Sequence, residues 1–369
     1  MLTQNNRLMR KLKAFSIFSL LSIAITCYGQ ELTWKFGYNY FFDNAEYALS
    51  TYSVDQTMHG MNLTPEIGWK LDDKQTVFTG VNLMKIYGEP SFTNGEDFLA
   101  YYQYKTPKVK FRAGAFPKED MLDNYSTFFF KDSVRFFRPI MHGLYLKINN
   151  SNNDFFNIWM DWTGYGSKNI RESFFIGASG LKRKGVLFGE MQSYLFHFAN
   201  TTPSTESFNV SEQFQMHLSA GASYSNDTGL DTLQSAVGGL IGLERDRGVD
   251  KGFDKPIGIT MRFNIEYNGL GTDNIAYFGN QRMSFYDRHG DDLYWGSPFL
   301  RGKSYVESKW YAQLIKSDRV NANIGLNMHM SEKQLLFQQT ITLSVNINKQ
   351  RDTKQHTSNM FPLMNFFTK

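Results

Sequence analysis

The sequence predicts an all-β fold, a transmembrane antiparallel β-barrel of about 16 strands, within a range of roughly 14 to 18. Three observations predict it. Apolar and polar residues alternate with period two over segments of about ten residues or more, which is the length that crosses a bilayer as a tilted strand. Aromatic residues make up 16% of the chain, and we expect them on the lipid-facing strands and in interfacial girdles near the strand ends. Short polar connections alternate with longer ones. A soluble β-sandwich also alternates, but its strands are usually only about 5–6 residues long.

The first 29 residues have the layout of a secretory signal peptide. A basic segment, 1–13, precedes the apolar run 14–26, and small residues follow at Cys27 and Gly29. Four of the 39 Lys and Arg residues lie in this segment, so the remaining 35 balance the 35 Asp and Glu. The net charge of +4 therefore belongs to the signal, and a nucleic-acid partner is not expected. We divide the chain into the signal peptide 1–29, the barrel 30–349 and a tail 350–369 of unknown role.

Five segments show the clearest alternation. They span residues 32–43, 61–71, 257–267, 320–330 and 335–348. In each, one face is apolar and suited to lipid, while the other is polar and suited to an aqueous interior. Phe41 is an exception, because it is an apolar residue on the polar face of the first segment. Segments 172–199 and 274–286 are poorly phased, which leaves 14 strands as an alternative.

The connections give the strand count. The short ones lie at 72–74, 106–108, 149–153, 181–184, 226–229, 269–273 and 317–318, and the longer ones at 44–60, 88–96, 117–140, 163–170, 200–208, 244–255 and 287–303. A further short connection at 331–333 must lie on the outer side. Together they join about 16 strands, with both ends of the barrel in the periplasm.

A barrel of this size is expected to enclose an aqueous channel. Its predicted pore-lining residues are Lys35, Glu66, Lys70, Lys110, Arg112, Lys147, Arg262, Glu266 and Lys309, with Asp161 and Glu307 on the same polar faces. Cations outnumber acids in this set, which indicates a mild preference for anionic solutes. A neutralised, hydrated wall without selectivity is the alternative.

The connection 117–140 is predicted to be the third extracellular loop. It is long and charged, with Lys118 and the predicted constriction residues Glu119, Asp120, Asp123, Lys131, Asp132, Arg135 and Arg138. Acids and bases facing each other across a channel would set up a transverse field on passing solutes. The loop also contains several Phe residues, so we expect it to pack, either on the inner wall or as an outward lid or partner surface.

The signal, the strand count and the long charged third loop make 30–349 resemble the porin superfamily. The stretches DSVRFFRPIMHGL at 132–144, DW at 161–162 and RESFFIG at 171–177 resemble uncharacterised outer-membrane barrels of Bacteroidota. In general porins the third loop folds inward and narrows the channel. The resemblance implies passive passage of small hydrophilic solutes across a Gram-negative outer membrane, with membrane lipid as a partner. It names no substrate, and a homo-oligomer is left open.

Enzymatic barrels exist, so histidines near acids or serines were considered. The candidates are the cluster at 287–292, His197 near Ser193, and His217 near Ser219, while His329 is predicted to be a lumen-wall residue. The cluster at 287–292 could be an acid–base pair or an oxygen-rich calcium site, but such a run is more often a solvated loop, and neither Ser–His pair shows a third catalytic member. We therefore expect a channel rather than an enzyme, with no cofactor and no metal site. A structural or partner-binding barrel of a glycan-uptake or secretion complex is the alternative, and an outer-membrane hydrolase ranks below it.

Overall fold

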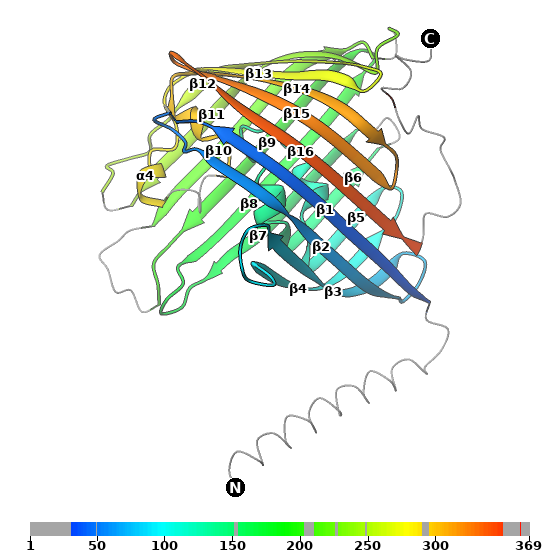
Figure 1. The fold of residues 1–369 in the computed structure, drawn as a ribbon. Helices are drawn as coiled ribbons and strands as arrows, with labels where there is room; N and C mark the ends of the chain where they lie inside the picture. Colours follow the sequence, from blue (N-terminus) through cyan, green and yellow to red (C-terminus); the bar gives the residue numbers. More distant parts are fainter. Residues whose placement is uncertain are drawn as a thin grey trace.

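The computed structural model contains one closed antiparallel β-barrel (Figure 1). It describes residues 31–48, 50–150, 154–202, 210–225, 228–247, 249–289, 295–349 and 362. The strands are β1 (Leu32–Glu46), β2 (Gln56–Lys70), β3 (Gln75–Ile86), β4 (Gly95–Lys105), β5 (Val109–Pro117), β6 (Ile140–Asn149), β7 (Phe155–Tyr165), β8 (Glu172–Lys184), β9 (Leu187–Phe198), β10 (Ser211–Ser223), β11 (Thr232–Asp246), β12 (Ile257–Tyr267), β13 (Leu270–Gly279), β14 (Ser304–Lys316), β15 (Val320–Ser331) and β16 (Gln334–Asn348). The prediction of about 16 strands is confirmed.

Each strand pairs with its sequence neighbours, and β1 pairs with β16 to close the sheet. Leu32 and Asn348 therefore lie at the same end of the barrel. The connections at that end are short, whereas those at the opposite end include 118–139 and 280–303. Outer-membrane barrels have short periplasmic turns and longer extracellular loops. We therefore call the end with the termini the periplasmic end and the other the outer end.

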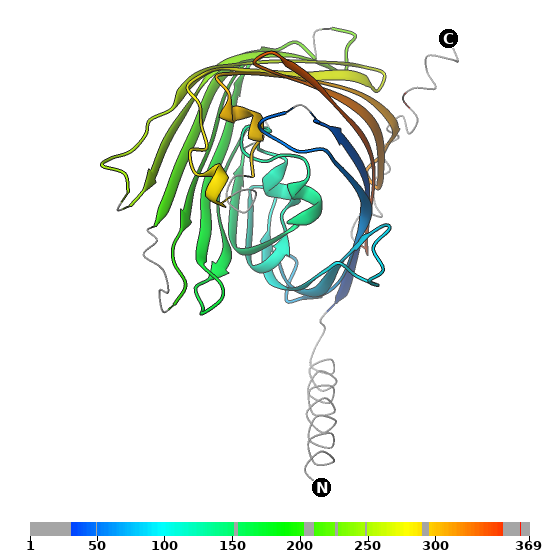
Figure 2. The ribbon, with the colours of Figure 1, turned by 60° about the vertical axis from the view of Figure 1, so that its left-hand side comes forward.

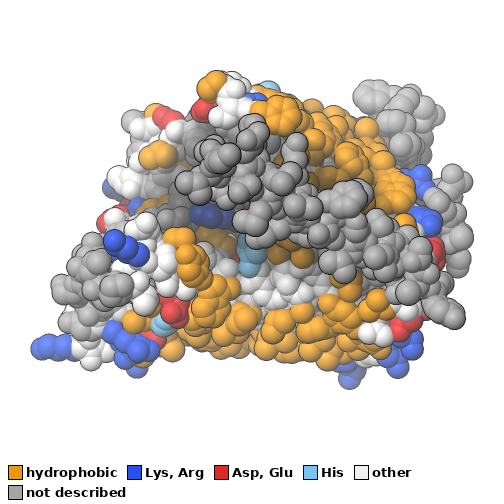
Figure 3. Space-filling view, turned by 90° about the horizontal axis from the view of Figure 1, so that it is seen from below, with side chains coloured by type: hydrophobic (Ala, Val, Ile, Leu, Met, Phe, Trp, Pro, Cys, Tyr) orange, Lys and Arg blue, Asp and Glu red, His pale blue; other side chains and the backbone are white. Residues whose placement is uncertain are grey.

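Successive side chains of each strand point alternately to lipid and to the interior. Figure 3 shows the outward side chains as a broad apolar band, with Lys, Arg, Asp and Glu gathered at its two ends. Phe98 is 67% exposed and Ile259 is 60% exposed, which would be costly in water but suits a hydrocarbon environment. Among the described residues, no helix is long and apolar enough to span a membrane.

The poorly phased segments are explained by the structure. Segment 172–199 is the pair β8 and β9, joined by a turn at 185–186 rather than at 181–184. Strand β13 ends at Gly279, so 280–286 belongs to the following loop. The turn predicted at 269–273 is shorter, because Asn268 and Gly269 both have positive φ, of 48° and 77°. This backbone is typical of a two-residue hairpin, and glycine adopts it without steric strain.

Two outer loops fold into the barrel, so the lumen is not the fully open channel expected from the strand count (Figure 2). Loop 118–139 contains two short helices, α2 (Glu119–Leu122) and α3 (Val134–Phe137). Loop 280–303 contains α4 (Tyr286–His289) and the 3-10 helix η2 (Pro298–Arg301). Their apolar side chains join one buried cluster with inward-facing aromatic residues of the wall, among them Tyr145, Trp159, Phe175, Tyr194 and Phe196.

This cluster corrects the interpretation of the aromatic content. The sequence analysis expects aromatic residues on lipid-facing strands and at strand ends. On β7, β8 and β9, however, the inward face is itself aromatic and packs against Phe129 and Phe130 of loop 118–139. The inward alternative for this loop is thus the observed one, since burial of these rings stabilises the inward conformation.

A buried ion pair fixes where loop 118–139 enters the lumen. Lys118 Nζ lies 2.6 Å from Asp161 Oδ2 on β7, and each side chain is 1% exposed. The ammonium group also lies 4.4 Å from the centroid of the Trp295 ring in the other inward loop. Such a pair requires both partners, because either charge alone would be buried without compensation. Lys118 therefore ties the loop to the wall and to loop 280–303.

The proposed domain limits fall largely outside the described residues. Segment 1–30 and, apart from Pro362, the tail 350–369 are not described. Pro362 is buried, and a Cβ added at Gly269 would come within 2.8 Å of its side chain. At this one residue the tail therefore contacts the β12–β13 turn at the periplasmic end. The signal peptide at 1–29 stays a prediction.

Candidate functional site

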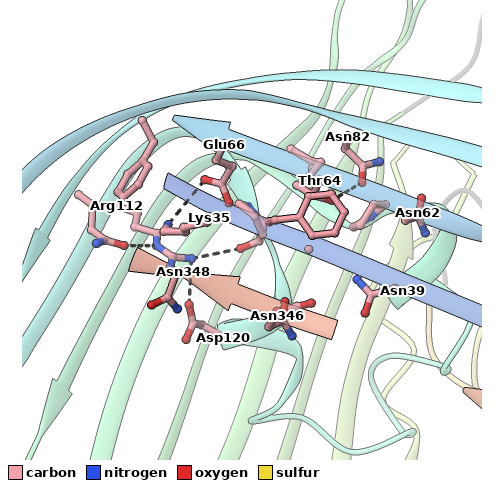
Figure 4. Close-up of a pocket in the computed structure, with 18 of the residues that line it drawn as sticks. Lys35, Asn39, Asn62, Thr64, Glu66, Asn82, Arg112, Asp120, Asn346 and Asn348 are labelled. Atoms are coloured by element: carbon pink, nitrogen blue, oxygen red, sulfur yellow. Dashed lines mark hydrogen bonds and ion pairs between the residues drawn. The ribbon is translucent and has the colours of Figure 1, made fainter. Parts of the chain in front are cut away.

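The main candidate site is a polar cavity inside the barrel, which we call the inner cavity (Figure 4). It has a volume of about 410 Å³, within the usual range for ligand pockets. The lumen faces of β1–β5 and β16 form its wall, and loop 118–139 covers it from the outer side. Its position follows from the fold, because the aromatic rings of the loops pack mainly against β7–β9, and the polar faces of β1, β2 and β16 keep open space beside them.

One end of the inner cavity is charged. Arg112 Nη1 and Lys110 Nζ lie 2.8 Å and 2.5 Å from Asp120 Oδ2 of α2. Lys35 Nζ donates a hydrogen bond of 2.6 Å to Tyr101 Oη, which in turn donates to Glu66. Two cations thus share the single carboxylate of Asp120. This end carries more positive than negative charge.

The other end is lined by side-chain amides. Figure 4 shows Asn39, Asn62 and Asn82 gathered away from the charged residues, with Asn346 of β16 beside them, whereas Asn348 pairs with Lys35 and lies at the charged end. Asn62 is 1% exposed, and its amide nitrogen donates a 3.0 Å hydrogen bond to the Phe136 carbonyl. Its Oδ1 atom has no hydrogen-bond partner among the described residues. An amide offers both donors and acceptors, so this end can bind hydroxyl groups of either polarity.

A second cavity, the outer vestibule, lies toward the outer end of the lumen and has a volume of about 430 Å³. It shares no lining residue with the inner cavity. Helix α3 lies between the two, since Ser133 lines the vestibule and Arg135 lines the inner cavity. The Phe136 ring stacks on Phe41 of β1 at a centroid distance of 4.4 Å. Phe41, the apolar exception on the polar face, is thus the wall residue against which the loop packs.

All nine predicted pore-lining side chains belong to the inward-facing set of their strands. Lys35, Glu66, Lys110 and Arg112 meet in the inner cavity. The others are dispersed: Lys70 pairs with Glu31, Lys147 lies over the Phe155 ring, Arg262 pairs with Glu190, Glu266 binds Tyr311 and Lys316, and Lys309 pairs with Asp132. As a permeation site, the set remains a prediction.

The predicted constriction residues divide between the two cavities. Glu119, Asp120 and Arg135 line the inner cavity, and Lys131 and Asp132 line the vestibule. Arg135 also pairs with Asp123 at 2.8 Å. Arg138 directly follows α3, at its C-terminal cap. The loop's acids and bases thus contact wall charges and one another. No simple pair of opposed rows is formed.

The histidines differ in what surrounds them. His217 and His329 face the lumen, where they bind Thr260 at 2.8 Å and Tyr305 at 2.8 Å. His217 is therefore not on a lipid-facing surface, as a phospholipase-like site would require. Most of the cluster 287–292 lies outside the described residues, although Asp287 pairs with Arg301 at 2.6 Å. Among the described residues, no group of three His, Cys, Asp or Glu side chains could hold a metal ion.

His197 belongs to a row of side chains on the lipid-facing surface, near the outer end. Directly paired positions place Trp162, Phe174, His197, Glu212 and Arg245 side by side on five neighbouring strands. The Phe174 and His197 rings stack at 4.8 Å, and Arg245 pairs with Glu212 at 2.6 Å. Arg247 pairs with Glu212 as well. We call these six residues the outer row.

Loop acids in the inner cavity and vestibule differ in their pKa. Burial raises the pKa of Glu119 above its usual 4.5. Burial would also raise the pKa of Asp120, but the charges of Arg112 and Lys110 outweigh it and hold this pKa below its usual range. The Lys309 charge likewise lowers the pKa of Asp132. Asp120 and Asp132 therefore keep their ion pairs at pH values where Glu119 is already taking up a proton.

This difference predicts a pH effect. A carboxyl with a lowered pKa stabilises the fold above its unfolded pKa, and this contribution is lost only as the pH falls through the folded value. As the pH falls from neutral toward the usual range of a carboxyl group, the loop should stay in place, while protonation of Glu119 makes the inner cavity more positive. The reversal potential in a salt gradient should then shift toward anions. The shift should be smaller in Glu119→Gln, and an equal shift in that variant would contradict the assignment.

The sequence analysis misses the amide residues of the inner cavity and the partners Tyr101 and Glu190. The predicted pore-lining set contains only the charged residues of the polar faces. Asn39 and Asn62 lie on the predicted polar faces of their strands, so the signal was present. What the sequence does not contain is the register that brings β1, β2, β3 and β16 together around one cavity.

Comparison with solved structures identifies outer-membrane porins as similar folds. OccK8 (OprE) of Pseudomonas aeruginosa aligns with a TM-score of 0.52 at 10% identity, over 86% of this chain and 98% of that chain. A loop-deletion mutant of OmpT from Vibrio cholerae gives 0.49 at 10% identity, over 86% and 99%. An anion-selective porin from Comamonas acidovorans gives 0.49 at 9% identity, over 87% and 99%. At such low identities the likeness concerns the fold alone, and at that level the alignment with OccK8 confirms the predicted porin-like barrel.

A search of curated proteins finds no match. The sequence profile of a family described as Lipid A 3'-O-deacylase-type matches residues 26–350. The expectation that the chain is not an enzyme is contradicted by this match, because the family is described by an enzymatic activity. Residues that pair across strands lie far apart in the sequence, so no local motif indicates them. Since the match spans most of the chain, the protein belongs to the Lipid A 3'-O-deacylase-type family.

Proposed function

We propose that the barrel is an outer-membrane channel through which small hydrophilic solutes pass, with loop 118–139 as its constriction. The observation that carries this proposal is a polar inner cavity together with an outer vestibule inside one closed barrel. The outer vestibule and the inner cavity lie one after the other along the lumen, and helix α3 lies between them. A polar lumen inside an apolar band is the arrangement that lets water and solutes cross a bilayer.

The charge of the inner cavity supports a mild preference for anions. Its charged lining residues are the cations Lys35, Lys105, Lys110, Arg112 and Arg135 and the acids Glu66, Glu119 and Asp120. Asp123, just outside the cavity, balances Arg135. One positive charge remains in excess. Charged residues that line a pore bias which ions enter it.

Charge reversal tests this preference. In planar bilayers the wild-type protein should conduct and show a reversal potential displaced toward the anion. Arg112→Glu should move the reversal potential toward the cation, because it makes the net charge of the inner cavity negative. Arg183→Glu is the matched control, because Arg183 lies at the periplasmic end of β8, away from both cavities. An unchanged reversal potential in Arg112→Glu would remove the anion preference and leave the channel proposal standing.

A second candidate function is cleavage of an acyl ester of lipid A, which the family description names. The outer row favours it, because it brings a histidine, a carboxylate and two arginines together on the lipid-facing surface near the outer end. His197 would take a proton from the water that attacks the ester carbonyl, and an alcohol and a fatty acid would be released. Channel and hydrolase use different faces of the wall, so the two proposals are independent.

Mass spectrometry of lipid A tests the second candidate. Purified protein mixed with lipid A in detergent should release a fatty acid, and His197→Ala should abolish this release. His59→Ala is the matched control, because His59 of β2 is also outward-facing and near the outer end but lies on a strand away from the row. No release by the wild-type protein, or equal release by His197→Ala, would overturn the assignment to this row.

The location of the protein is part of the proposal. The apolar band and closed sheet suit the outer membrane, and the segment 1–29 would direct export and be removed. Membrane lipid is then the partner of the outward face. A homo-oligomer stays a prediction, which the mass of the protein in detergent would test.

A further inference from the structure

We infer that the inner cavity binds a sugar acid, a monosaccharide-sized solute with several hydroxyl groups and one carboxylate. This inference rests on the proposed channel function and names the class of solute that the cavity selects. It comes from the division of the cavity into a charged end and an amide end.

The charged end fits one carboxylate. Arg112 is held in place by three contacts, with the Gln103 side chain at 3.1 Å, the Pro117 carbonyl at 3.3 Å and Asp120 at 2.8 Å. A guanidinium fixed in this way presents its remaining N–H groups in a set direction, which suits the planar carboxylate. The excess of one positive charge also matches one carboxylate better than a phosphate ester, which carries roughly −1.5 to −2 at neutral pH.

The amide end fits hydroxyl groups. Asn39 and Asn346 make no side-chain hydrogen bond within the described part of the chain, and Asn62 has a free carbonyl oxygen there. Asn82 accepts from Thr64 at 2.9 Å and keeps its amide nitrogen for another partner. Donors and acceptors thus line the same wall. A hydroxyl, which both donates and accepts, is the group that satisfies them.

The two ends together exclude other solute classes. A simple carboxylate such as acetate would reach the charged end and leave the amides without partners. A neutral sugar would bind the amides and leave the positive charge uncompensated. A site built to hydrogen-bond hydroxyls discriminates strongly against solutes that lack them, because its polar groups then stay unpaired. We therefore expect selectivity to need both features in one molecule.

Current recordings through the full-length mature protein test the inference. Galacturonate added to one side should interrupt the current, and galactose, acetate and galactose 6-phosphate should need concentrations at least roughly tenfold higher for the same effect. Arg112→Gln should abolish the difference between galacturonate and galactose. Asn39→Ala combined with Asn346→Ala should abolish the difference between galacturonate and acetate. Arg183→Gln is the control, because Arg183 lies at the periplasmic end of β8, away from both cavities, and should keep both differences.

The outcomes separate this inference from the channel proposal. If the protein conducts but galacturonate acts no more strongly than galactose or acetate, the sugar-acid site is wrong and the channel stands. If galactose 6-phosphate acts more strongly than galacturonate, the carboxylate assignment is wrong. If no current is seen in salt alone, the channel proposal itself fails. Within the described part of the chain, the double amide variant removes no hydrogen-bond partner of another side chain, and a wild-type current in salt would show that it folds.

Discussion

Replacing Lys118 with Met should lower the free energy of unfolding by roughly 3–5 kcal/mol, the largest stability effect that we expect from any single substitution in this barrel. The reason is the ion pair with Asp161, in which both side chains are 1% exposed. Without Lys118, the Asp161 carboxylate would be buried without an opposite charge. The measurement is urea unfolding of the protein in micelles or bilayers, followed by tryptophan fluorescence.

Two variants show whether the charge causes the loss. Lys118→Met combined with Asp161→Asn should recover much of the stability, since Asn still offers an oxygen to the His142 backbone N–H that Asp161 now binds at 2.9 Å. Lys182→Ala is the control. The Lys182 side chain pairs with Asp154 but is 74% exposed, so this pair should contribute at most about 1 kcal/mol to the free energy of unfolding. A Lys118→Met protein within about 1 kcal/mol of the wild type would contradict the role of this pair.

Replacing Phe136 with Ala should open a path between the outer vestibule and the inner cavity. The ring stacks on Phe41 at the point where α3 separates the two cavities. Its removal leaves space in the lumen, and we expect roughly twice the wild-type conductance with little change in ion preference, because no charge is altered. Phe92→Ala removes the same ring from an outer loop where Phe92 is 91% exposed, and should change nothing. Equal conductance of Phe136→Ala and wild type would place the constriction elsewhere.

Much of the fold is predictable from the sequence, because a lipid-facing strand must be apolar on every second residue. The rule is weaker on β7, β8 and β9, where the inward face also carries large aromatic side chains, among them Trp159, Phe175 and Tyr194. The difference in polarity between the two faces of these strands is then smaller. The inward loops explain those aromatics, and no local pattern could show this, since the contact that fixes the loop joins residues 118 and 161.

The candidate site is predictable only in part. The alternation of inward and outward positions along each strand places Lys35, Glu66 and Arg112 on the inner face. Their proximity to Asp120, however, depends on how loop 118–139 folds back onto the wall. Phe41 is a useful exception, because an apolar residue on a polar face indicates a partner inside the lumen. The outer row was missed for another reason. It consists of residues from five strands that become neighbours only through the register.

The central claim is that a lumen partly filled by its own loops still passes small hydrophilic solutes. Solute-dependent swelling of liposomes that contain the purified protein tests it most directly, with empty liposomes as the reference. The account predicts swelling whose rate falls steeply from pentoses to disaccharides and increases in Phe136→Ala. Swelling no faster than in empty liposomes, for every solute and in both proteins, would contradict it.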